Sequence, residues 1–235
     1  MLSRYKNYNS EFVKKNLMGP NVIKIAEEFS EHLQLEEGMK VLDLGCGTGL
    51  SSIFLAKEFG VTVFATDLWI SATENYKRIK EMNLENKVYP IHSEAHTLPY
   101  ADNFFDAIVS FDSYHYYGTD ELYLSPYLIK FVKIGGQIGF ASPGLTEEFN
   151  DGVPNNLQKY CPDGEFLTFH SHLWWKKLWE RSKVVDVVET FNLKCNADAW
   201  NDWITSDNPI GKNDTDFYND VKQLATIGIV ARRKI

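Results

Sequence analysis

The feature that most constrains the fold of this chain is the alternation of short apolar runs with helical patterns through its middle. Residues 40–44 and 61–66 are short, largely apolar runs, as expected of strands that are buried on both faces of a sheet. Between them, residues 50–59 place apolar side chains at helical spacing, and Gly60 fits the position just after a helix. Strands that alternate with helices through short turns predict βαβ units and a parallel sheet.

The alternation extends in both directions along the chain. We expect further strands at 88–91, 105–110, 137–141, 184–191 and 224–231, and helices at 22–33, 71–82, 121–132, 172–179 and around 199–203. Residues 143–170 are rich in Gly, Pro, Asn and Asp and are expected to form a loop. The predicted fold class is therefore α/β: a doubly wound, mostly parallel, seven-stranded sheet of the Rossmann-like kind, with an antiparallel C-terminal strand and a cap of loop and helix.

Composition excludes several classes of partner. The net charge of −8 argues against nucleic acid, because such binding depends on Lys and Arg neutralising phosphates. No stretch approaches the roughly 18 apolar residues of a membrane span, and the first residues lack the apolar run of a signal peptide. Three widely spaced cysteines and a His-x-His pair without a third ligand suggest neither a disulfide framework nor a metal site. We expect a cytoplasmic protein, either monomeric or homo-oligomeric.

A glycine-rich turn follows the first strand and is the strongest candidate for a ligand site. Residues 43–49 read Asp-Leu-Gly-Cys-Gly-Thr-Gly, and glycines at such a turn let the backbone approach a ligand closely. The dinucleotide fingerprint G-x-G-x-x-G would need a third glycine where Leu50 stands. Asp67 closes the second strand about twenty residues past the turn, where a carboxylate can accept hydrogen bonds from ribose hydroxyls. Taken alone, Asp67 is equally well explained as a helix cap.

A third segment completes an ordered set of motifs. Residues 93–100 read Ser-Glu-Ala-His-Thr-Leu-Pro-Tyr, and Phe105-Asp106 follows shortly after. Together with D-x-G-x-G-x-G and Asp67, this segment resembles class I S-adenosylmethionine (SAM)-dependent methyltransferases, and most closely the type 11, ubiquinone/menaquinone-biosynthesis-like group. The resemblance covers about residues 38–142. Within that group's pattern, Glu94 stands where an Asp is usual.

The resemblance implies SAM as the cofactor and assigns residues to it. Glu94 would meet the adenine amino group, the backbone N–H of Ala95 a ring nitrogen, and the backbone near Phe111 the methionine part of SAM. The full set of implied cofactor-binding residues is Asp43, Gly45, Gly47, Gly49, Asp67, Leu68, Glu94, Ala95 and Phe111.

The resemblance does not fix a catalytic residue, because methyl transfer needs a base only when the nucleophile must lose a proton. His115, just after the fourth strand, is the one imidazole expected near the transferred methyl, and we take it as the candidate base. The alternative is a structural histidine packed among tyrosines. Cys46, inside the turn, is interpreted as a small apolar filler.

The acceptor pocket is expected beneath a cover at the carboxyl edge of the sheet. The candidate cover consists of the first twenty residues and residues 143–182, through Tyr5, Tyr8, Trp174 and Trp175. Most of the tryptophans after residue 170 are interpreted as packing residues, and one or two as pocket residues.

The chain is thus interpreted as one SAM-dependent methyltransferase domain, 1–235. Its parts are an N-terminal cap and first helix (1–37), a cofactor-binding core (38–142), a cap and acceptor-pocket insertion (143–182) and C-terminal strands (183–235). The predicted function is methyl transfer from SAM to a nitrogen, oxygen or carbon of a small-molecule acceptor. A nicotinamide-dependent oxidoreductase and a non-catalytic SAM-binding regulatory protein are the alternatives.

Overall fold

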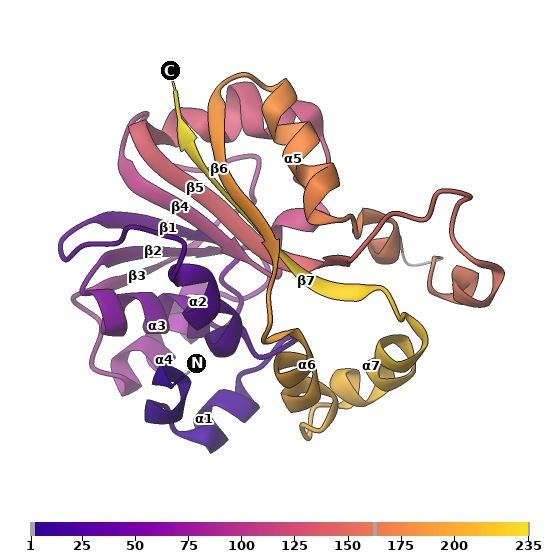
Figure 1. Cartoon of the computed structure of the whole chain (residues 1–235). Coiled ribbons are helices and arrows are strands. Elements are labelled where there is room, and N and C mark those ends of the chain that lie inside the picture. The colour runs from indigo at the N-terminus through magenta and orange to yellow at the C-terminus, as the bar shows by residue number, and fades with distance from the viewer. Residues whose placement is uncertain (1–2, 162–163, 235) are drawn as a thin grey trace.

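The centre of the molecule is a seven-stranded sheet in the order β3-β2-β1-β4-β5-β7-β6 (Figure 1). It is seen in a computed structural model that describes residues 3–161 and 164–234. The strands are β1 (Lys40–Leu44), β2 (Thr62–Asp67), β3 (Val88–His92), β4 (Phe105–Phe111), β5 (Val132–Leu145), β6 (Val185–Asn192) and β7 (Leu224–Arg233). β1 to β5 pair in parallel, whereas β7 runs antiparallel to both β5 and β6. The predicted sheet, mostly parallel with an antiparallel C-terminal strand, is confirmed.

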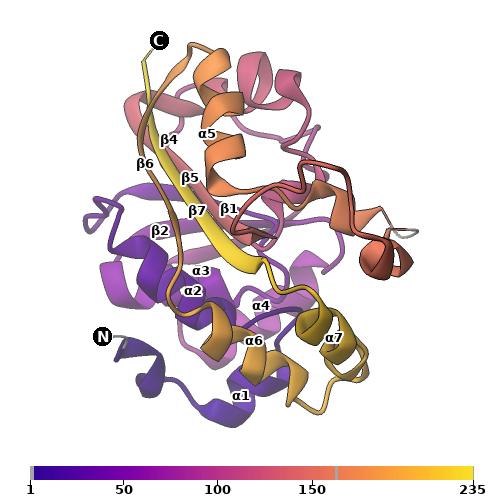
Figure 2. The same ribbon diagram turned by 45° about the vertical axis from the view of Figure 1, so that its right-hand side comes forward.

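Helices cover both faces of the sheet (Figures 1 and 2). They are α1 (Ser10–Lys15), α2 (Val22–Ser30), α3 (Leu50–Phe59), α4 (Ala72–Glu81), α5 (His172–Arg181), α6 (Asn196–Ile204) and α7 (Pro209–Asp220). One buried cluster joins α2, α3 and α6 to one face through Phe29, Phe54 and Trp200. A second cluster joins α5 to the other face through Trp175 and Trp179. The sheet is therefore the middle of three layers.

Three segments differ from the sequence-based expectation. In place of a regular helix at 121–132, a π-helical turn (Tyr123–Tyr127) and a 3-10 turn (Leu128–Phe131) occur, with Pro126, which lacks an N–H, inside the first. β5 continues beyond its predicted end at residue 141 to Leu145, and 3-10 turns at Asn155–Tyr160 and Glu165–Thr168 lie within the expected loop.

Helices α1 and α7 were not predicted, because neither carries a long apolar stripe. The sequence nevertheless contains residues that favour the start of a helix at both places. The side chain of Asn9 accepts hydrogen bonds from the N–H groups of Glu11 and Phe12, and that of Asn208 from the N–H of Ile210. Asparagine is a favoured helix cap, and Pro209 at the first position of α7 suits a helix start.

The tryptophans of α5 belong to the core rather than to a cover. Trp175 is completely buried and packs edge-on against Phe140 of β5, with ring centroids 4.9 Å apart. Trp179 and Tyr114 complete this aromatic group. Trp174 stacks on His170 at 3.7 Å. The expectation that Trp174 and Trp175 cover the acceptor pocket is wrong, because α5 lies on the other face of the sheet from α6 and α7 (Figure 1).

The burial of Trp175 predicts a large effect on stability. Trp175→Ala is expected to lower the free energy of unfolding by about 3–5 kcal/mol, because it leaves a cavity in a closely packed core. Leu173→Ala on the same helix is the control, since Leu173 is 55% exposed, and should change stability by less than about 0.5 kcal/mol. Urea unfolding of both variants measures the difference. Equal losses would contradict the placement of α5.

Asp43 connects the end of β1 to the helix that follows it. Its side chain is fully buried, and one carboxylate oxygen, Oδ2, accepts hydrogen bonds from the hydroxyls of Ser51 and Ser52 on α3, each 2.6 Å long. The other oxygen, Oδ1, has no hydrogen-bond partner among the described residues. Burial raises the pKa of Asp43 to about 6, although the two serine hydroxyls act in the opposite direction. Asp43 therefore connects the turn to α3 through hydrogen bonds, while its own side chain stays buried.

This raised pKa predicts a pH-dependent stability. The folded state holds the Asp43 proton to higher pH than the unfolded state, so the contribution of Asp43 to stability falls as pH rises from about 4 to 6. Asp43→Asn keeps an oxygen for the serines but cannot ionise. Its stability relative to the native protein should rise across this window by about 1–3 kcal/mol and then stay constant. Urea unfolding from pH 4 to 8 tests this, and parallel curves for the two proteins would refute it.

Candidate functional site

A cavity of about 970 Å³ lies at the carboxyl ends of β1, β2 and β4. Leu44, Asp67 and Phe111, the last residues of these three strands, all line it. β1 is paired with β2 on one side and with β4 on the other, so the strand order reverses here. Such switch points create the crevice in which open α/β sheets bind ligands.

The glycine-rich turn forms one wall of the cavity. Gly45, Gly47 and Gly49 have φ values of 73°, 53° and 83°, in the left-handed region that favours glycine. A Cβ atom on Gly45 would lie 1.9 Å from the hydroxyl oxygen of Ser113, so no larger residue fits this packing. Gly45 and Gly47 line the cavity. Gly49 instead occupies the N-cap position of α3 and, like Asp43, is not among the described lining residues.

Asp67 fixes the turn to the end of β2. Its Oδ2 accepts a hydrogen bond from the N–H of Gly47 at 2.8 Å, and its Oδ1 accepts from the N–H groups of Trp69 and Ile70, each at 2.8 Å. The side chain lines the cavity. An ionised carboxylate offers about four acceptor positions, so Asp67 retains capacity for a ligand hydroxyl. Leu68, the next residue, also lines the cavity and is 49% exposed.

The N-terminal segment closes the cavity next to the turn. Asn16 accepts a hydrogen bond through its carbonyl oxygen from the Thr48 hydroxyl, at 2.6 Å, and through its side chain from Arg78 Nε, at 2.8 Å. Asn75, on α4 beside Arg78, donates to the carbonyl of Gly47 at 2.8 Å. Residues 16–22 contribute five of the lining residues: Asn16, Met18, Gly19, Pro20 and Val22. The predicted N-terminal contacts were Tyr5 and Tyr8, and neither lines the cavity.

Glu94 and Ala95 line the cavity beyond the end of β3. Oε1 of Glu94 lies 2.6 Å from His96 Nδ1, and Oε2 accepts from the His96 N–H at 2.8 Å. Slight burial raises the pKa of Glu94, but the contacts with His96 outweigh it and lower the pKa overall. The hydroxyl of Tyr123 donates to the carbonyl of Ala95 at 3.0 Å and so positions this segment.

Phe111 and Asp112 line the cavity at the end of β4. Asp112 has a φ of 54°, uncommon for a residue with a side chain, and its N–H donates to the carbonyl of Ala141 at 2.8 Å. A Cβ on Gly19 would lie 2.1 Å from the Oδ2 atom of Asp112, so the carboxylate lies directly against the N-terminal segment. Sequence reasoning missed Asp112, although its position next to Phe111 was a usable signal.

His115 does not line the cavity. Its side chain is completely buried, 4.1 Å from the ring of Tyr116 and 5.3 Å from that of Phe169 between centroids. Both of those neighbours do line the cavity. The side chain of His115 thus lies behind the cavity wall, and its role as the base stays a prediction. Cys46 is buried in the turn, and burial raises the pKa of its thiol well above the usual value.

The far end of the cavity is aromatic. Residues 160–169 contribute three rings, and α6 and α7 contribute three more: Tyr160, Phe166, Phe169, Trp200, Trp203 and Phe217. Within the range 143–182, the residues that line the cavity therefore all precede α5. The helices between β6 and β7 supply the rest; a helix around 199–203 and one or two pocket tryptophans were expected, whereas α7 was not.

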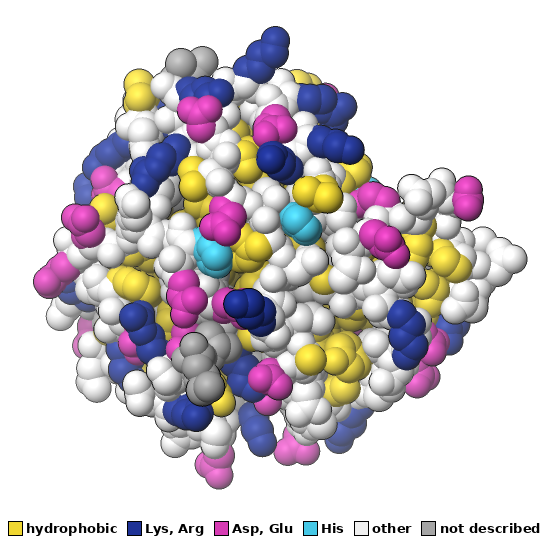
Figure 3. Space-filling model, viewed as in Figure 1, with side chains coloured by type: hydrophobic (Ala, Val, Ile, Leu, Met, Phe, Trp, Pro, Cys, Tyr) yellow, Lys and Arg dark blue, Asp and Glu magenta, His cyan; other side chains and the backbone are white. Residues whose placement is uncertain are grey.

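Neither a metal-binding group of side chains nor a membrane-spanning helix is found among the described residues. Among the described residues, no group of three His, Cys, Asp or Glu side chains is placed to hold a metal ion. Within the same part of the chain, no helix has the length and apolar character needed to cross a bilayer. Figure 3 shows acidic and basic side chains interspersed over one face of the molecule.

Comparison with known proteins agrees with the motifs. Residues 41–136 match a family model described as a methyltransferase domain. The curated protein "Methyltransferase GfsG" of Streptomyces halstedii is 28% identical over 140 residues, which are 59% of this chain and 50% of that protein. The chain thus spans half the length of this relative.

Solved structures of similar fold cover more of the chain. Geranyl diphosphate C-methyltransferase from Streptomyces coelicolor A3(2) has a TM-score of 0.71 and 20% identity, over 89% of this chain and 76% of its own. The [4+2]-cyclase SpnF has a TM-score of 0.72 and 15% identity, over 92% and 82%. At these identities the likeness concerns the fold. Over residues 41–136 the chain is therefore similar to a methyltransferase domain, and the glycine-rich turn set against Asp67 agrees with the resemblance to class I SAM-dependent methyltransferases.

Proposed function

We propose that this protein transfers a methyl group from SAM to a small-molecule acceptor. One observation carries the proposal: Gly45, Gly47, Asp67 and Glu94 line a single cavity that extends past the end of β4 into an aromatic compartment. A volume of about 970 Å³ lies at the upper end of the roughly 300–1,000 Å³ usual for small-molecule sites. Such a cavity has room for a cofactor and an acceptor side by side.

The residues of the first half fit the parts of SAM. We propose that Asp67 accepts hydrogen bonds from the ribose hydroxyls, with Leu68 beside it. The Glu94–Ala95 segment would meet the adenine, and the turn at Gly45 and Gly47 the methionine part, near Phe111. Asp43 and Gly49 would act indirectly, by holding the turn and starting α3.

We add Asp112 to this set. Its carboxylate lies against Gly19 at the end of β4, on the side where the methionine part of SAM is proposed to lie. A carboxylate there suits the ammonium group of methionine, because opposite charges attract strongly where water is scarce.

Catalysis by this chain would consist mainly of orientation. When bound, SAM supplies an electrophilic methyl group on a sulfonium. The chain has to hold the nucleophile in line with the methyl–sulfur bond, and orientation of this kind contributes roughly 7–11 kcal/mol in favourable cases. Tyr117 lines the cavity with its hydroxyl 3.2 Å from that of Ser113, and burial raises the pKa of its phenol above the usual value.

The second candidate is a protein that has this fold and binds SAM but does not transfer its methyl group. The observation that favours it is the similarity of this chain to a [4+2]-cyclase, at a TM-score of 0.72. A shared fold does not imply a shared reaction.

Turnover distinguishes these candidates. The protein is expected to convert SAM to S-adenosylhomocysteine when given the small-molecule fraction of a cell extract, and to transfer isotope from methyl-labelled SAM into an extract component. Mass spectrometry detects both products. If S-adenosylhomocysteine binds but no label is transferred in extracts of varied source, the second candidate is favoured and the proposal of methyl transfer fails.

Removing the charge of Asp67 is expected to weaken cofactor binding. Asp67→Asn keeps one oxygen for the backbone N–H groups but lacks the charge that strengthens hydrogen bonds to ribose, a loss of about 1.5–3 kcal/mol, or tenfold or more in Kd. Calorimetric titration with S-adenosylhomocysteine measures this.

Asp106→Asn is the matched control, because Asp106 lies near the start of β4, at the opposite edge of the sheet, where it pairs with Lys133. Its affinity for S-adenosylhomocysteine should equal that of the native protein. An unchanged affinity in a folded Asp67→Asn protein would remove Asp67 from the cofactor site.

A further inference from the structure

Six aromatic rings from two parts of the chain line the aromatic end of the cavity. Tyr160, Phe166 and Phe169 lie on one stretch of chain, and Trp200, Trp203 and Phe217 on α6 and α7. The faces of aromatic rings carry negative electrostatic potential. They attract cations, and the attraction is stronger where water is excluded.

The charges that line the cavity are all of one sign. Four carboxylates line it, on Asp67, Glu94, Asp112 and Asp214. Among the described lining residues there is no Lys, Arg or His. Glu94 is paired with His96, and Asp67 and Asp112 belong to the proposed cofactor half. Asp214 is therefore the carboxylate at the aromatic end.

Asp214 is held in place by that aromatic wall. Its Oδ2 accepts a hydrogen bond from the indole N–H of Trp203 at 2.7 Å, so an aromatic ring and a carboxylate are presented together. Two lysines near this end form ion pairs with other carboxylates: Lys24 lies 2.8 Å from Asp202, and Lys159 lies 2.8 Å from Asp220. Neither lysine lines the cavity.

We infer that the methyl acceptor carries a positively charged nitrogen, recognised by Asp214 and the surrounding rings, and is not a phosphate or carboxylate compound. The inference rests on the proposed function and adds the class of acceptor. A phosphate or carboxylate placed here would face like charges and find no basic partner, and burying a charge without a partner is costly.

Three probes that share a phenyl ring and differ in charge test this inference. The probes are 2-phenylethylamine, 2-phenylethanol and 3-phenylpropionate, titrated into the protein saturated with S-adenosylhomocysteine. We expect the amine to bind at least about tenfold more tightly than the carboxylate, with the alcohol between them. If the carboxylate binds as tightly as the amine, or if no probe shows a charge preference, the inference is overturned.

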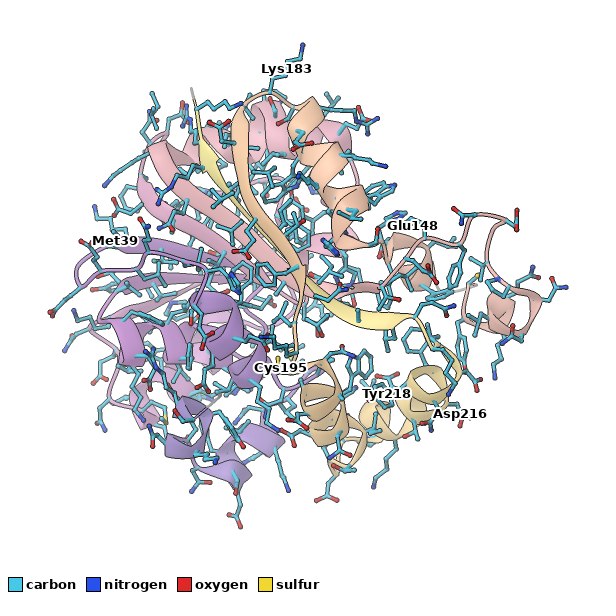
Figure 4. All side chains as sticks on the ribbon, viewed as in Figure 1. Met39, Glu148, Lys183, Cys195, Asp216 and Tyr218 are labelled. Atoms are coloured by element: carbon cyan, nitrogen blue, oxygen red, sulfur yellow. The ribbon has the colours of Figure 1, made fainter. Side chains whose placement is uncertain are left out.

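The variant Asp214→Asn tests whether Asp214 causes the preference for the positively charged probe. The amide keeps an oxygen for the Trp203 N–H but loses the charge, so affinity for the amine should fall about three- to tenfold while affinity for the alcohol stays within twofold. Asp216→Asn is the matched control, because Asp216 lies on the same helix, is exposed and does not line the cavity (Figure 4). An equal loss for amine and alcohol would show that Asp214 acts only on structure and would overturn its assignment.

The experiments distinguish a failure of the proposed function from a failure of the inference about the acceptor. If S-adenosylhomocysteine does not bind at all, the proposed function fails and the acceptor class fails with it. If S-adenosylhomocysteine binds while the charge preference is absent, only the inference about the acceptor fails.

Discussion

The parallel pairing of β1 with β2 on one side and β4 on the other is the constraint on which the site depends. Val41, Leu42 and Asp43 are in register with strands on both sides, so the carboxyl ends of the three strands reach the same edge of the sheet. The chain leaves β1 toward β2 and β3 and later returns on the opposite side as β4 and β5. The loops that follow β1 and β4 therefore lead away from each other, and this divergence creates a crevice between them.

Polar contacts then give that crevice its shape. Asp43 holds α3 from below the turn, and Asp67 holds the N–H of Gly47 from the end of β2. Asn16 and Asn75, linked through Arg78, join the N-terminal segment to the same turn. Apart from the contact of Arg78 with Asn75 inside α4, each of these hydrogen bonds connects two different elements of the chain. Such a network holds the binding groups in place before any ligand arrives, which lowers the entropic cost of binding.

The two ends of the cavity have different origins. The cofactor end is formed by short loops after strands of the sheet, a feature shared with other proteins of this fold. The acceptor end is formed by residues 160–169 and by the helices inserted between β6 and β7. The region matched by the family model ends at residue 136 and includes neither segment. In the proposed arrangement these two segments select the acceptor, which is consistent with the general rule that one fold can host different reactions.

The sequence by itself determined the succession of strands along the chain, the parallel sheet and the glycine-rich turn near Asp67. Those features follow from local patterns: apolar runs, helical periodicity and glycines at backbone angles that other residues avoid. Which side chains enclose the acceptor was decided only by tertiary structure. Trp175 and Trp203 are both tryptophans on predicted helices, yet the first lies in the core of one face and the second lines the cavity on the other. His115 follows β4 directly, yet its side chain is buried behind Tyr116 and Phe169. Sequence spacing gives the position of a residue along an element, whereas the packing of that element against the sheet decides where its side chain points.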